Sequence, residues 1–145
     1  MKALSLWNPF AEFMRIGLKT IETRSWPTSY RGALAIHAAK RDVDELGWEL
    51  VGKFYTRENP LNPMYYGAVV AVVDLSECVR VETFHDGKGG FCLTETELEL
   101  GDYSNGRFAW MTRHAAPLRK PLPMRGRQGL WNLAPQEIQQ INERL

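Results

Sequence analysis

The amino-acid sequence predicts one domain of the α+β class, a small mixed β-barrel with short helices around it. The chain has 145 residues, which is the usual length of a single domain. Hydrophobic residues make up 44% and charged residues 24%, as in ordinary globular proteins, so a disordered or fibrous chain is excluded. Short β-prone runs are scattered among a few helical patterns without the regular alternation of a doubly wound sheet. A small barrel is the architecture that remains.

The first half of the chain contains three predicted strands, at 2–7, 20–26 and 33–38. A helix is expected directly after Asn8-Pro9, because asparagine suits a helix N-cap and proline the first helical position. Gly17 suits the end of that helix. A second helix is predicted over 42–55. The apolar side chains assigned to the two helices are Phe10, Phe13, Met14, Ile16, Leu46, Leu50, Val51 and Phe54.

The second half contains the most β-prone run of the chain, 67–73, which continues towards Val81 and is expected to form a long, bent strand at the centre of the barrel. Breaker residues predict loops at 59–63 and 87–90. A short helix is expected at 93–100 with Thr94 as its cap. Strands are predicted at 108–116 and 118–122, where two prolines limit pairing to a sheet edge. A polar helix at 135–145 ends the chain.

Charge is distributed unevenly although the formal net charge is only +1. Residues 61–105 contain two basic and eight acidic residues. Residues 106–131 contain six basic residues and no acidic one, which is a candidate anion-binding face. The alternative is an ordinary solvated surface. If Arg119, Lys120, Arg125 and Arg127 contact phosphates, affinity for RNA should fall steeply with salt.

Several site classes are excluded by the absence of their motifs. His37, His85 and His114 are far apart in sequence and belong to no metal-binding pattern, so no metal is expected. There is no P-loop, GxSxG or GxGxxG motif, and no cofactor is expected. Cys78 and Cys92 lack a CxxC pattern, and a reducing cytoplasm is the expected location. No apolar run approaches the length of a membrane span.

The densest group of polar residues is the segment 17–27, GLKTIETRSWP. The period of a strand places Thr20, Glu22, Arg24 and Trp26 on one face, with Lys19 at the rim. An acid, a base, a hydroxyl and an indole on one face favour a ligand-binding cleft. The alternative is an exposed strand with a Glu22–Arg24 ion pair of little consequence for stability.

Together with its neighbours, this segment resembles the ASCH domain family of the PUA-like superfamily. The resemblance rests on LSLWNPFA at 4–11, on the GxKxxExR pattern at 17–24, on YRG at 30–32 and IHA at 36–38, and on GRFAW, PLP and GRQGLW between 106 and 131. It covers nearly the whole chain, 1–145, as a single domain. The resemblance implies a barrel of five to six strands flanked by short helices, with a cleft along the GxKxxExR strand.

The resemblance implies an RNA- or modified-nucleoside-binding module with no membrane partner. Lys19, Arg24 and Arg31 would hold a phosphate or carbonyl, Glu22 would accept from a base amino group, and Trp7 or Trp26 would stack. The residues expected to bind are Trp7, Lys19, Thr20, Glu22, Arg24, Trp26, Arg31, His37, Arg125 and Arg127.

The alternative is a small hydrolase acting on RNA or on an acylated cytidine, with Glu22 as general base and Lys19 stabilising an oxyanion. An amidohydrolase branch of the family uses a lysine, a threonine and a glutamate. Its lysine corresponds to Lys19, but Glu22 stands where its threonine falls. Thr20 or Thr23 would have to replace that threonine.

Overall fold

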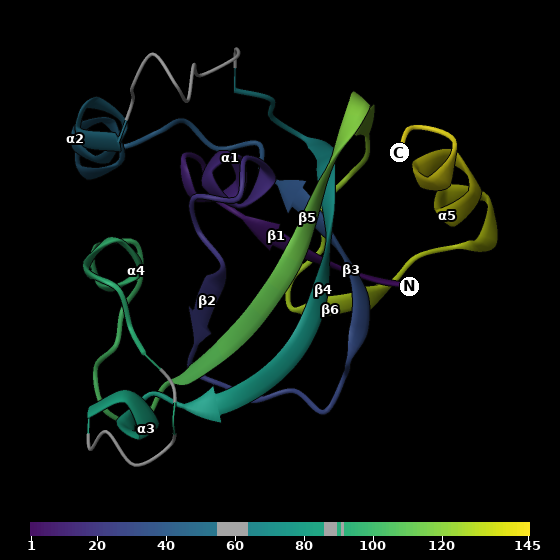
Figure 1. Ribbon diagram of the computed structural model, residues 1–145. Coiled ribbons are helices and arrows are strands. Elements are labelled where there is room, and N and C mark those ends of the chain that lie inside the picture. Colours follow the sequence, from purple (N-terminus) through teal and green to yellow (C-terminus); the bar gives the residue numbers. More distant parts are fainter. Residues whose placement is uncertain (55–63, 86–89, 91) are drawn as a thin grey trace.

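Figure 1 presents the computed structural model, which describes residues 1–54, 64–85, 90 and 92–145. The described strands form one six-stranded sheet in the order β2-β5-β4-β3-β1-β6, curled into a half-barrel. All neighbouring strands are antiparallel except β1 and β3, which are parallel. The α+β class and the barrel-like sheet predicted from the sequence are therefore confirmed. The strands are β1 (Lys2–Leu6), β2 (Ile21–Arg24), β3 (Gly32–Ala38), β4 (Ala68–Arg80), β5 (Phe108–Pro123) and β6 (Leu130–Asn132).

The long central strand is β4, as predicted from its apolar run. It pairs with β3 on one side and with β5 on the other, and register shifts bend the β4–β5 ladder. The two strands expected at 108–116 and 118–122 are one continuous strand, β5. Only the first part of β5, up to Met111, also pairs with β2. Pro121 and Pro123 therefore lie where β5 is a sheet edge, which is the position predicted for them.

The helices lie around this sheet. In Figure 1, α2, α3 and α4 lie on the side of β2, and α5 lies on the opposite side, near both chain termini. None of the helices in the described residues is long and apolar enough to cross a membrane. The helices are α1 (Phe10–Arg15), α2 (Glu45–Phe54), α3 (Glu82–His85), α4 (Glu95–Glu99) and α5 (Pro135–Asn142).

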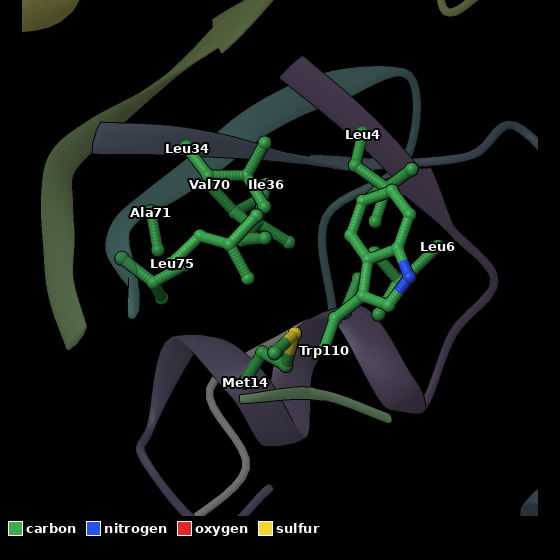
Figure 2. Packing of buried hydrophobic residues seen from close by; sticks show 12 residues of the cluster. Leu4, Leu6, Met14, Leu34, Ile36, Val70, Ala71, Leu75 and Trp110 are labelled. Carbon is green, nitrogen blue, oxygen red and sulfur yellow. The ribbon is translucent and has the colours of Figure 1, made fainter. Parts of the chain in front are cut away.

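The main core is shared between the sheet and α1, and Figure 2 shows its side chains at close range. Trp110 of β5 and Met14 of α1 pack against leucine, isoleucine and valine side chains from β1, β3 and β4. Phe13, Val70 and Val72 are buried, which agrees with the apolar patterns of α1 and β4. Phe10 and Ile16 are only half-buried: Phe10 borders an open cavity, and Ile16 is the C-cap of the short helix α1.

Three details differ from the sequence-based expectations. The N-cap of α1 is Pro9 rather than Asn8, whose side-chain amide instead donates to the Tyr65 carbonyl at 2.8 Å. The helix predicted over 42–55 begins only at Glu45, and its Leu46 is 62% exposed. The short helix α3 was not predicted. The expected loop 59–63, most of the loop 87–90 and Tyr55 lie outside the described residues.

Candidate functional site

A cavity of about 590 Å³ opens beside β2, and we call it the β2 cavity. Its floor comes from β1, α1 and β2, and its outer wall comes from α2 and the segment from α4 to Asp102. Its lining combines apolar and charged side chains. The side chains that carry this mixed character are Trp7, Phe10, Leu46, Leu50, Glu22, Glu99, Asp102, Arg24 and Arg107.

Glu22 and Arg24 are neighbours on the cavity-facing side of β2, as the strand period predicts. Arg24 Nε lies 3.1 Å from Glu22 Oε1, which is the ion pair considered from the sequence. The pair is not aligned as a hydrogen bond. Arg24 Nη2 donates to the Ser5 carbonyl at 2.8 Å, which fixes the guanidinium against β1. Among the described residues, neither oxygen of Glu22 accepts a hydrogen bond.

Lys19 does not lie at the rim of the cleft, and that expectation is wrong. Its side chain is 2% exposed, and its Nζ donates to the carbonyls of Ile21 and, at 2.8 Å, of Leu100. The same Nζ lies 3.4 Å from Glu22 Oε2. The Lys19 side chain reaches the Leu100 carbonyl at the end of α4. The ammonium therefore connects the outer wall of the cavity to its floor.

Glu97 makes the second connection between α4 and β2. This buried carboxylate accepts from the Thr20 amide at 2.6 Å and from the Thr20 hydroxyl at 2.7 Å. Thr20 is thereby used within the protein and does not line the cavity. No motif in the sequence points to Glu97. Its one sequence signal is the Thr94 cap, which fixes the start of α4 and is present in the structure.

The two tryptophans predicted to stack are in different environments. Trp7 is 54% exposed, lines the β2 cavity, and has the Arg41 guanidinium 3.5 Å from the centre of its ring. Trp26 packs edge-on against Trp110 with ring centres 4.7 Å apart, and its carbonyl accepts from the Trp110 indole. Trp26 does not line the cavity, because its ring completes the core.

His37, Arg125 and Arg127 lie outside the β2 cavity. They line a second cavity of about 560 Å³, which we call the Arg125 cavity. Ser5 lines both cavities. Arg31 lines neither, and its guanidinium donates to the carbonyls of Thr28 and Tyr30. The single cleft expected from the sequence is therefore divided in two.

Arg107 and Asp102 also line the β2 cavity, although neither was predicted as a site residue from the sequence. Arg107 Nη2 donates to the Thr23 carbonyl at 3.1 Å, and Arg107 Nε lies 3.5 Å from Asp102 Oδ2. Hydrogen bonds from Ser104 lower the pKa of the Asp102 carboxyl, so it is ionised at neutral pH. No periodic pattern could point to these two residues, because both come from loops that fold back onto β2. Within the described residues, no group of three potential ligands is arranged to hold a metal ion.

Tyr103 directly follows Asp102, and its hydroxyl is buried without a hydrogen-bond partner among the described residues. Burial raises the pKa of Tyr103, and the carboxylates Glu97 and Glu22 raise it further. The phenol therefore stays neutral and adds no charge to the site.

Comparison with known proteins agrees with this fold. A family model of the ASCH domain matches residues 4–121. Activating signal cointegrator 1 from Mus musculus and from Homo sapiens are each 25% identical over 137 residues, which cover 90% of this chain. That match spans only 22% of either relative, so the chain corresponds to a small part of those proteins.

Two solved structures of ASCH from Zymomonas mobilis have a similar fold. The structure without a named mutation superposes with a TM-score of 0.59 at 21% identity, over 98% of this chain and 93% of the other. A mutant form gives a TM-score of 0.60 at 20% identity, over 98% of this chain and 96% of the other. The family match over most of the chain and the shared fold lead to one conclusion: this chain belongs to the ASCH domain family.

Proposed function

We propose that the protein binds RNA and that the β2 cavity receives one unpaired base, either ordinary or modified. The observation that carries the proposal is the combination of Glu22, Arg24 and Arg107 with apolar walls in a single cavity of about 590 Å³. That volume is in the usual range for small-molecule sites, which is roughly 300–1,000 Å³. A nucleobase has two apolar faces and an edge of alternating donors and acceptors. The apolar walls of the cavity can contact the faces of the base, and its charged side chains can bind the edge.

The polar groups match the edge of a base. Glu22 is charged, lines the cavity and has both oxygens free of hydrogen bonds within the described residues, so it can accept from an exocyclic amino group. The guanidiniums of Arg24 and Arg107 can donate to a base carbonyl. Phe10 and Leu50 provide apolar contact, and the half-exposed Trp7 provides a stacking surface at the rim.

Binding is better supported than hydrolysis by the environment of Lys19. An oxyanion-stabilising lysine must present its ammonium to the substrate, but Lys19 Nζ is buried and already donates to two carbonyls. The hydroxyl of Thr20 donates to Glu97, but Thr20 does not line the β2 cavity, so it is not placed to attack a substrate bound there. We therefore assign Lys19 a positioning role for Glu22 in this proposal.

The free thiols of Cys78 and Cys92 fit the cytoplasmic location expected from the sequence.

The test uses pairs of matched variants. Trp7 and Trp48 are exposed to nearly the same extent, 54% and 53%, but only Trp7 lines the cavity. Trp7→Ala should lower affinity by about 1–3 kcal/mol, the usual contribution of one stacked base, and Trp48→Ala should have no effect. Glu22→Gln should weaken binding of bases with an exocyclic amino group, while Glu77→Gln on the exposed surface of β4 serves as its control.

Binding is measured by calorimetry with a mixed single-stranded RNA octamer and with a panel of ordinary and modified nucleosides, including N4-acetylcytidine. Chromatography of the same mixtures detects turnover. Equal affinities for the two tryptophan variants would refute the base-binding proposal. Release of cytidine from N4-acetylcytidine that Glu22→Gln abolishes without loss of binding would establish the hydrolase instead.

A further inference from the structure

The Arg125 cavity has a different chemical character from the β2 cavity. It lies where β1 and β3 end, against the segment 124–128 that follows β5. Its lining contains the cations Lys40, Arg125 and Arg127 and no carboxylate among the described residues. The β2 cavity, in contrast, contains Glu22, Glu99 and Asp102. An anion is therefore attracted to the Arg125 cavity and meets repulsion from several carboxylates in the other.

The floor of the Arg125 cavity is rigid. His37 is 2% exposed and its Nε2 lies 2.8 Å from the Met124 carbonyl. A carbonyl can only accept, so Nε2 carries the proton, and the Ser5 hydroxyl 2.9 Å from Nδ1 then donates to the neutral ring. Burial lowers the pKa of His37, which keeps the ring neutral at pH 7. Because both ring nitrogens are used, His37 acts as a positioning residue.

The segment that carries the two arginines is pressed onto this floor. A Cβ atom at Gly126 would lie 2.5 Å from His37 Cε1 and 2.8 Å from Ser5 Oγ, so only glycine allows the observed approach. Arg125 and Arg127 flank Gly126, and both are exposed. The backbone beneath the two guanidiniums is thereby fixed before any ligand arrives, which lowers the entropic cost of binding.

The two cavities are neighbours across β1. Ser5 lines both, and the Arg24 guanidinium of the β2 cavity donates to the Ser5 carbonyl. Arg41, stacked on Trp7 at the rim of the β2 cavity, directly follows Lys40 of the Arg125 cavity. A strand of nucleic acid that leaves a base in the β2 cavity would pass over Ser5 and reach these cations.

We propose that the Arg125 cavity binds a backbone phosphate of the same RNA strand whose base occupies the β2 cavity. This inference rests on the proposed function, and it distinguishes RNA from a free nucleoside as the ligand. Arg119 and Lys120, which the sequence grouped with Arg125 and Arg127, line neither cavity. They therefore provide a control pair with the same change in charge.

The test compares R125Q/R127Q with R119Q/K120Q for binding of the RNA octamer and of a phosphate-free nucleoside from the panel. Losing the contact with one phosphate on a single strand should make the slope of log K against log[salt] less steep by about 0.7 for R125Q/R127Q only. Nucleoside affinity should be unchanged in both. In the wild-type protein, the ring NMR signals of His37 should shift on addition of the octamer and should not shift with the nucleoside.

Two results would overturn the inference and can be told apart. If both double variants have the same RNA affinity and salt slope, the phosphate site is wrong while the base site stands. If R125Q/R127Q weakens RNA binding but Trp7→Ala and Glu22→Gln do not, the proposed base site fails and the joint site fails with it. Absence of any RNA binding by the wild type would refute both proposals.

Discussion

Replacing Lys19 by methionine should destabilise the protein strongly, because the ammonium is the centre of a buried polar cluster. Its Nζ bonds the carbonyls of Ile21 and Leu100 and lies 3.4 Å from the Glu22 carboxylate. Methionine keeps most of the volume of the side chain, so the apolar packing around the stem should survive. What is lost is the partner of one carboxylate and of two carbonyls.

The size of the effect follows from these lost contacts. Removing one partner of a buried ion pair usually costs about 3–5 kcal/mol, since the other charge is left uncompensated. Glu22 keeps Arg24 at 3.1 Å, so we expect the lower end of that range, about 3 kcal/mol. In a domain of this size such a loss lowers the melting temperature by roughly 10 °C.

Urea denaturation followed by tryptophan fluorescence measures this loss, and Lys53→Met is the matched control. Lys53 also pairs with a glutamate of the α4 wall, Glu99, but its side chain is 57% exposed. An exposed pair contributes about 0–1 kcal/mol. The double variant Lys19→Met/Glu22→Gln should recover part of the loss, because it removes the uncompensated charge as well. A Lys19→Met variant no less stable than Lys53→Met would refute the structural role of Lys19.

Two further predictions concern the floor of the Arg125 cavity. Gly126→Ala should lower the free energy of unfolding by about 1–3 kcal/mol, because the added Cβ overpacks against the His37 ring. The control is Gly52→Ala in α2, where nothing lies within 4 Å of the added Cβ and the change should be neutral or slightly stabilising. Urea denaturation measures both variants. Burial lowers the pKa of His37 despite the Met124 carbonyl, so the unfolded state binds the proton more readily than the folded state. The contribution of His37 is therefore complete above about pH 6.5 and is lost as pH falls towards the folded pKa, and His37→Gln should reduce this dependence.

Local patterns were sufficient to predict most of the fold. The apolar run before Val81 could only be an inner strand, and it is the centre of the sheet. The period of two along β2 is confirmed by burial, since Glu22 and Arg24 are half-buried and Ile21 and Thr23 are buried. Both inferences depend on backbone geometry within a few residues, and such geometry is encoded locally.

The parts of the site that could not be predicted depend on contacts between distant segments. Lys19 was expected at the rim because a lysine is rarely buried. Its buried ammonium is hydrogen-bonded to the Leu100 carbonyl, which lies 81 residues further along the chain. Glu97, Asp102 and Arg107 join the site because α4 and the following loop fold against β2. Leu46 and Leu50 of α2 line the β2 cavity, and the sequence pattern of this helix alone does not show that its apolar side borders an open cavity.

The buried lysine explains how the cavity can present a carboxylate that is charged and still available to a ligand. A lone carboxylate between apolar walls would be costly to desolvate, and one fully hydrogen-bonded within the protein would have nothing left for a base. Here Lys19 Nζ lies 3.4 Å from one oxygen of Glu22, and Arg24 Nε lies 3.1 Å from the other. They compensate its charge without aligned hydrogen bonds, and its accepting capacity remains directed to the cavity. The spacing of the GxKxxExR pattern suits this arrangement. The lysine precedes β2 and reaches both Glu22 and the Leu100 carbonyl, and the arginine follows two residues after the glutamate and so shares its face.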